Sequence, residues 1–114
     1  MSWTDIFSAW GTAGADDWVG TIEALTTENV FYADPHSGPI SGRQGLIGVV
    51  EQFRSMMPDG GAAARDSDGY DGHARAAVDF LRGGQPMMTG QYIAELDSDG
   101  RITRLIGFSS PPTP

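Results

Sequence analysis

The chain of 114 residues contains no cysteine and no lysine. Without cysteine it can form no disulfide, no thiolate nucleophile and no zinc–thiolate site. Without lysine it has no amine for a Schiff base, because all seven basic residues are arginines. No apolar run approaches the roughly 20 residues of a membrane-spanning helix, and no secretory signal precedes Trp3. We therefore expect a cytoplasmic domain with no membrane partner.

Basic charge is also scarce. The 7 basic residues face 15 Asp and Glu residues, which leaves a net charge of −8. Such an acidic chain disfavours a nucleic-acid partner, because nucleic acids attract basic surfaces. A hydrophobic content of 39% supports a genuine core. We expect one domain over residues 1–110, followed by a frayed, proline-rich tail over residues 111–114.

Three helices are predicted by apolar residues spaced three or four positions apart, each preceded by a capping signal. The signals are capping boxes at residues 2–5 and 41–44 and the pair Asp16-Asp17. The apolar stripes are Trp3, Ile6, Phe7 and Trp10, then Trp18, Ile22 and Leu25, and finally Leu46, Val50, Phe53 and Met57.

Strands are predicted elsewhere, over residues 29–33, 62–70, 73–81, 87–96 and 101–108. Residues 34–39 are expected to form a turn, and Asp71-Gly72 is a two-residue hairpin signal. The predicted order is α-α-β-α-β-β-β-β, an α+β layout in which a curved, mostly antiparallel sheet packs one face on three helices. Helices set against a bent sheet leave a hollow, which is a usual small-molecule site.

Residues 30–43, with the sequence VFYADPHSGPISGR, resemble a segment of the nuclear-transport-factor-2-like superfamily. They are most similar to its SnoaL-like branch of polyketide cyclases and ketosteroid isomerases. Gly90-Gln91-Tyr92 and residues 95–102 are similar to the last two strands of that family. The resemblance implies a cone-like curved sheet around an apolar cavity and a reaction without a cofactor. It also implies a homodimer through the outer face of the sheet, near Thr89, Gln91 and Thr103. No metal is expected, because nothing in the spacing of Asp34, His36 and His73 demands a metal site.

Asp34 matches the aspartate that serves as the proton-shuttling base in ketosteroid isomerases. By strand alternation it shares a side with Val30 and Tyr32, where a carboxylate could accept a proton from a bound ligand. The alternative is an Asp-Pro turn in which Asp34 only binds local amides. His36 could join a proton relay or could be a solvent-exposed loop residue.

Tyr92 falls where the isomerases carry a second hydrogen-bond donor, and its phenol could stabilise a carbonyl or enolate oxygen. The alternative is a core tyrosine. The isomerases' tyrosine on the first helix is replaced here by Phe7 or Trp10. Together with the catalytic candidates, the expected pocket residues are Trp10, Trp18, Tyr32, Phe53, Met57 and Met88.

Two hypotheses for the function remain open, and a third is less favoured. The first is a cofactor-independent isomerase, cyclase or dehydratase that acts on a small apolar carbonyl compound. The second is a non-catalytic module that binds a hydrophobic ligand or acts as a dimeric adaptor. The third, epoxide hydrolysis, requires Arg75 and Asp79 inside the cavity, whereas strand alternation favours His73, Arg75 and Asp79 on the outer face.

Overall fold

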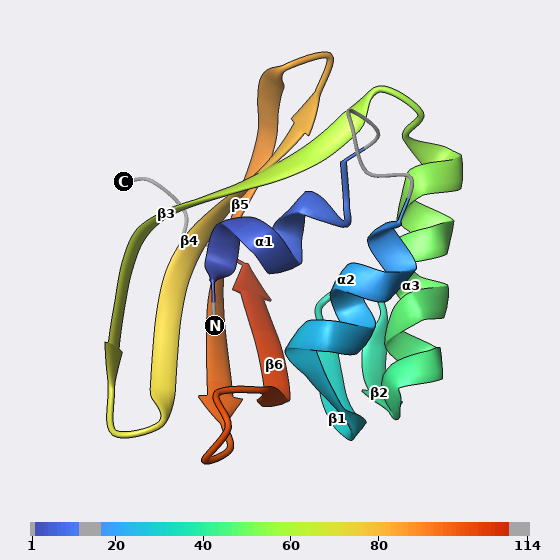
Figure 1. Ribbon diagram of the computed structural model, residues 1–114. Helices are drawn as coiled ribbons and strands as arrows, with labels where there is room; N and C mark the ends of the chain where they lie inside the picture. Colours follow the sequence, from blue (N-terminus) through green and yellow to red (C-terminus); the bar gives the residue numbers. More distant parts are fainter. Residues whose placement is uncertain (1, 12–16, 110–114) are drawn as a thin grey trace.

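The computed structural model describes residues 2–11 and 17–109 (Figure 1). The expected tail at residues 111–114 and Asp16 lie outside the described residues. The elements are α1 (Trp3–Ser8), α2 (Trp18–Leu25), β1 (Thr26–Asp34), β2 (Gly38–Ser41), α3 (Arg43–Met56), β3 (Gly60–Tyr70), β4 (His73–Arg82), β5 (Gln85–Leu96) and β6 (Ile102–Ser109).

The first two helices begin where their capping signals predict. The Ser2 hydroxyl accepts a hydrogen bond from the Asp5 amide at 3.2 Å. The Asp17 carboxylate accepts one from the Gly20 amide at 3.1 Å. Each side chain thereby satisfies one of the unpaired amides in the first turn of its helix.

The capping box expected at residues 41–44 is wrong. Ser41 is held in the edge strand β2, opposite Phe31 of β1. The N-cap of α3 is Gly42, which makes no side-chain capping bond and has a φ of 91°. Its amide donates to the Val30 carbonyl at 2.8 Å. Glycine suits this position because the chain must turn sharply from a strand into a helix with φ in the left-handed region.

All six strands form one sheet in the order β2-β1-β6-β5-β4-β3. β1 and β6 run parallel, and the other neighbouring pairs are antiparallel. The predicted Asp71-Gly72 hairpin is confirmed, with φ of 51° and 75° at the two residues. Gly83 and Gly84 turn the chain in the same way between β4 and β5, with φ of 57° and 79°. Positive φ at both central residues is typical of type I′ turns.

The observed order of elements is α-α-β-β-α-β-β-β-β, so the sequence prediction missed one strand. β2 occupies the end of the segment that was expected to be a turn. It is four residues long, contains Pro39 and lies at the edge of the sheet. Proline is tolerated in an edge strand because no further strand requires its missing amide.

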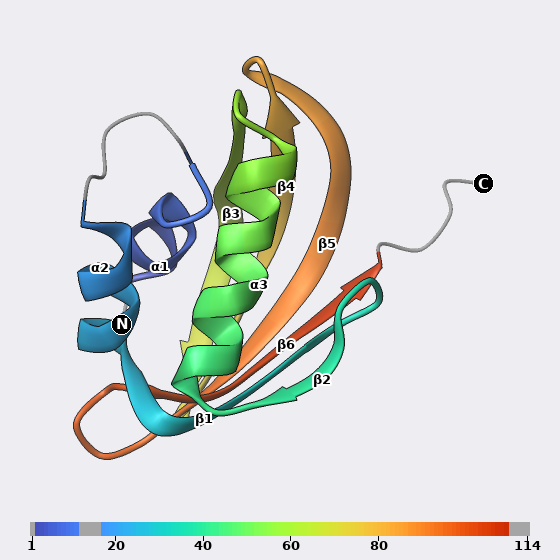
Figure 2. The ribbon, with the colours of Figure 1, turned by 90° about the vertical axis from the view of Figure 1, so that its right-hand side faces the viewer.

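The helices lie on one side of the sheet, and Figure 2 shows β4 and β5 bending around that side. The apolar stripe of the first helix and its C-terminal turn is buried, with Ile6 and Phe7 fully inaccessible to solvent. The core joins this stripe to the inward face of the strands, which includes Val30, Val78 and Leu105. No helix within the described ranges is both long and apolar enough to cross a membrane.

Candidate functional site

A cavity of about 750 Å³ lies between α3, the β1–β2 turn and the first half of β5. This volume falls in the range of sites that bind small organic molecules. Five of the six expected pocket residues line it, namely Trp10, Tyr32, Phe53, Met57 and Met88. Asp34, His36 and Tyr92 line it as well. Its wall is therefore largely apolar and rich in aromatic and methionine side chains, and Asp34, His36 and Ser37 form a polar region at the end of β1.

Asp34 ends β1, and Pro35 follows it in the turn. Its Oδ1 accepts hydrogen bonds from the backbone amides of His36 at 2.8 Å and Ser37 at 2.5 Å. Its Oδ2 accepts from the Ser37 hydroxyl at 3.2 Å and from the Tyr32 hydroxyl. The carboxylate therefore organises the Asp-Pro turn and also lines the cavity.

The hydroxyl groups of Tyr32 and Tyr92 lie 3.2 Å apart. A phenol carries one hydrogen, and Tyr32 donates its hydrogen to Asp34. Tyr92 is therefore the donor when the two hydroxyls bond to each other. The three groups form one directed chain, in which Tyr92 donates to Tyr32 and Tyr32 donates to the carboxylate.

Both phenols keep their protons at neutral pH. Burial raises the pKa of Tyr92 to about 12. Burial, together with the neighbouring Tyr92 and Asp34, raises the pKa of Tyr32 well above its ordinary value. Both effects disfavour a buried phenolate. Each phenol thus keeps its one hydrogen to donate.

Tyr92 occupies its position because its neighbours leave room for the ring. Gly107 lies directly opposite it on β6, and a Cβ built there falls 2.5 Å from Tyr92 Cζ. The Phe7 ring meets the Tyr92 ring edge-on, with centroids 5.0 Å apart. Phe7 thus supports the phenol from the first helix instead of supplying a hydroxyl of its own.

His36 is exposed at the rim of the cavity. Its contact with Asp34 uses the backbone amide, not the imidazole ring.

Trp18, which was expected in the pocket, lies outside it. The Arg54 guanidinium lies over its ring, 5.1 Å from the ring centroid, where α2 contacts α3.

The residues that epoxide hydrolysis would require face away from the cavity. Arg75 pairs with Asp68 at 2.7 Å, and Asp79 pairs with Arg65 at 2.8 Å. His73 is also exposed, 3.5 Å from Glu95. The predicted outward orientation of His73, Arg75 and Asp79 is confirmed, and it leaves Arg75 and Asp79, which that alternative requires, outside the cavity.

The structure adds lining residues that the sequence reading did not select. Gly45, Gly48 and Gln52 line the cavity from one face of α3, and Ser37 lines it from the turn. The spacing of 45, 48 and 52 follows a helix face, but small and polar residues at that spacing usually indicate a solvated surface.

The cavity contains little charge. Within the described ranges none of the arginines lines it, so Asp34 and His36 are its titratable groups apart from the two phenols. No group of three His, Asp or Glu side chains in the described part of the chain could hold a metal ion. A cavity of this kind suits an uncharged, largely apolar ligand.

No family model matches the chain, and no curated protein matches it. Several solved structures do match the chain. A candidate isomerase of the SnoaL-like family from Agrobacterium tumefaciens is 22% identical, and the alignment covers 92% of this chain and 91% of that one with a TM-score of 0.80. The chain has the nuclear-transport-factor-2-like fold.

Two further solved structures share this fold. IdmH from Streptomyces antibioticus, a candidate polyketide cyclase, is 18% identical, with 93% of this chain and 87% of that one covered and a TM-score of 0.73. A candidate ketosteroid isomerase from Kribbella flavida is also 18% identical. The alignment covers 96% of this chain and 76% of that one, with a TM-score of 0.70. At this level of identity the likeness establishes the nuclear-transport-factor-2-like fold and nothing finer.

Proposed function

We propose that the chain is a cofactor-independent enzyme that moves a proton on a small, apolar carbonyl compound bound in the cavity. The observation that supports this most directly is the chain of hydrogen bonds linking Tyr92, Tyr32 and Asp34 on one wall of the cavity. A carboxylate base and a phenol donor are the two groups that enolisation of a ketone requires.

In the proposed reaction Asp34 takes a proton from the carbon next to the carbonyl. The electron pair of the broken C–H bond moves into the carbonyl group and forms an enolate. The Tyr92 hydroxyl turns from Tyr32 to the enolate oxygen and stabilises its charge. Asp34 then returns the proton to another carbon, which isomerises the substrate and restores the carboxylate. A cyclisation or a dehydration would begin with the same abstraction.

The surroundings of the two groups support this chemistry. Tyr92 is 3% exposed, and aromatic residues surround its ring, so a hydrogen bond from it acts in a poorly solvated environment. No arginine in the described part of the chain lines the cavity, which favours a neutral ketone over an anionic ligand. The homodimer through the outer face of the sheet is part of the proposal, and the partly exposed, outward-facing Ile93 supports it.

A second function, a ligand-binding module without catalysis, is favoured by one observation. Four protein donors already occupy the two oxygens of Asp34. This is the arrangement expected of a carboxylate whose task is to hold a turn. The two functions differ in whether the negative charge of Asp34 is needed.

The Asp34→Asn variant separates the two functions. The amide oxygen of asparagine can still accept from the His36 and Ser37 amides, but asparagine cannot take up a proton. The probe is 2-tetralone, an apolar ketone with acidic α-protons, and its exchange with D₂O is followed by proton NMR. We expect the variant to lose exchange about 100-fold or more while it still binds the ketone.

Asp97→Asn is the matched control. Asp97 holds a turn in the same way, accepting from the amides of Asp99 at 3.0 Å and Arg101 at 2.9 Å, and it lies outside the cavity. This variant should exchange 2-tetralone as fast as the wild type. Equal exchange rates for Asp34→Asn and the wild type would remove Asp34 as the base. Binding without exchange above the solvent rate in either protein would favour the non-catalytic module.

A further inference from the structure

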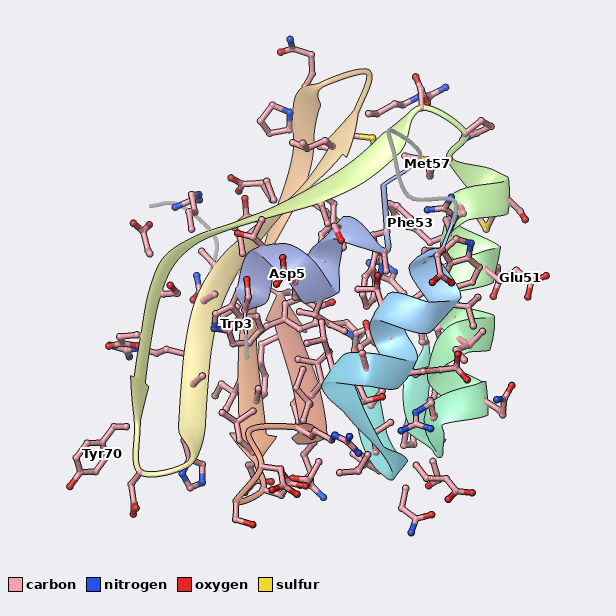
Figure 3. All side chains as sticks on the ribbon, in the orientation of Figure 1. Trp3, Asp5, Glu51, Phe53, Met57 and Tyr70 are labelled. Carbon is pink, nitrogen blue, oxygen red and sulfur yellow. The ribbon has the colours of Figure 1, made fainter. Side chains whose placement is uncertain are left out.

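The sulfur atoms of this molecule are gathered in one place. The chain has five methionines and no cysteine, so methionine holds all of its sulfur. Met1 lies outside the described residues, and the other four methionines, Met56, Met57, Met87 and Met88, all line the cavity. They form two adjacent pairs, one at the end of α3 and one near the start of β5. Figures 1 and 2 show both places at the upper end of the molecule, and Figure 3 shows Met57 there with Phe53.

Three of these methionines are exposed to solvent. Met56 is 69% exposed, Met87 50% and Met88 44%, whereas Met57 is half-buried. Side chains that line a cavity and also reach solvent lie at its rim, so we call Met56, Met87 and Met88 the rim methionines. Methionine usually fills irregular gaps inside a core, and none of the three belongs to the core here. A small solute can therefore reach their thioethers without any change in the fold.

The rim methionines form part of the apolar surface that a ligand meets at the cavity. This surface continues at Phe108 of β6, which lines the cavity and is 52% exposed. An apolar ligand gains free energy when it leaves water for contact with such groups. A chemical change that makes the rim polar therefore weakens the binding of an apolar ligand.

We propose that the rim methionines are an oxidation site, at which a peroxide converts thioethers to sulfoxides and lowers the affinity of the cavity for apolar ligands. This inference rests on the proposed small-molecule site but not on its proton chemistry. The sulfur lone pair attacks one oxygen of hydrogen peroxide, and the S–O bond forms as the O–O bond breaks. Sulfur loses two electrons. The departing oxygen takes the proton from the transferred oxygen and leaves as water.

Oxidation changes the rim in a way that an apolar ligand detects. A sulfoxide is polar and accepts hydrogen bonds from water, whereas a thioether is apolar and accepts them weakly. A ligand that covers a sulfoxide removes this water and offers no donor in return, which is unfavourable. Because sulfoxide reductases return methionine sulfoxide to methionine, the change is reversible.

The test follows oxidation and binding in the same sample. The wild-type protein is treated with hydrogen peroxide, and catalase then removes the excess. Mass spectrometry of the intact chain counts the oxygen atoms added, peptide mapping locates them, and isothermal titration calorimetry measures the affinity for 2-tetralone. We expect the rim methionines to be oxidised before Met57 and the dissociation constant to rise about fivefold or more. Treatment with methionine sulfoxide reductases should restore the affinity.

The matched control is the triple variant Met56→Leu, Met87→Leu and Met88→Leu, which keeps an apolar rim without its thioethers. Each protein is compared with its own untreated form, because the leucines change the shape of the rim. Met57 remains in the variant, so an effect of its oxidation appears in both proteins. We expect the treated variant to keep its affinity within about twofold.

Four results would overturn the inference. They are an equal loss of affinity in both proteins, unchanged affinity of the wild type with all three rim methionines oxidised, oxidation of Met57 before the rim, and loss of near-ultraviolet circular dichroism on oxidation, which would place the effect on the fold. Failure of the untreated wild type to bind 2-tetralone would remove both the site and the inference. If peroxide weakened binding while neither the wild type nor Asp34→Asn exchanged the ketone, the proposed reaction would fail and this inference would stand.

Discussion

Replacing Gly107 with alanine would place a methyl group against the ring of Tyr92. The two residues are directly opposite each other on β6 and β5. A Cβ at position 107 lies 2.5 Å from Tyr92 Cζ and 2.6 Å from Cε2, whereas ordinary contacts begin at 3.4 Å. The ring must therefore move by about 0.9 Å, the difference between 3.4 and 2.5 Å, or the strand must give way.

The cost of this movement follows from the packing around the ring. Phe7 lies against the Tyr92 ring with centroids 5.0 Å apart, so the phenol has little free space. Overpacking a core of this kind costs about 1–3 kcal/mol. Alanine is favoured over glycine in a strand by only about 0.5–1 kcal/mol, so the steric term prevails. We expect the free energy of unfolding to fall by about 1–2 kcal/mol.

Urea denaturation of a double-mutant cycle measures this effect. Gly107→Ala is made in the wild type and in Tyr92→Leu, which lacks the ring. In the second background the alanine should be neutral or stabilising by up to about 1 kcal/mol, which leaves a coupling energy of about 1–3 kcal/mol. An equal loss of stability in both backgrounds would show that the Tyr92 ring is not what Gly107 accommodates. The reasoning would then be wrong.

Two further predictions concern stability at high pH and the packing of α3. Because burial raises the pKa of Tyr92 to about 12 from 10.0, the unfolded state loses this proton first, and the free energy of unfolding should fall between pH 10 and pH 12. Tyr92→Phe should reduce that fall by about 2 kcal/mol in urea denaturation at stepped pH, and an unchanged pH profile would contradict the assignment. Arg54 donates to the carbonyls of Ala9 and Gly11 through one guanidinium nitrogen, so Arg54→Lys should lower the free energy of unfolding by about 1–3 kcal/mol. A lysine variant with wild-type stability would refute that role.

Local signals in the sequence were enough to predict most of the secondary structure. The Ser2 and Asp17 caps, the apolar stripe around Phe7 and the Asp71-Gly72 turn each act within a few residues of chain. β2 was missed because its four residues, one of them Pro39, have no strand pattern of their own. It is a strand only because β1 supplies its partners.

The candidate site was predicted unevenly for the same reason. Asp34 and Tyr92 were selected through the resemblance of their segments to a family, and both line the cavity. Tyr32 was expected only to line the pocket, yet its hydroxyl connects Asp34 with Tyr92. Trp18 was expected in the cavity and packs under Arg54 instead. A helix stripe predicts which face is buried, but not whether a neighbouring helix or a cavity covers it.

The sequence by itself therefore determined the helices, the hairpins, the acidic and cysteine-free chemistry and the face of β1 on which Asp34 lies. These properties depend on residues near one another in the chain. Only the tertiary structure decided that Tyr92 meets Tyr32 across 60 residues, that β1 runs parallel to β6, and that methionines from the end of α3 and from β5 line one cavity. These features depend on how far the sheet bends and on which side chains fill the resulting hollow, and that is set by the packing of the whole core.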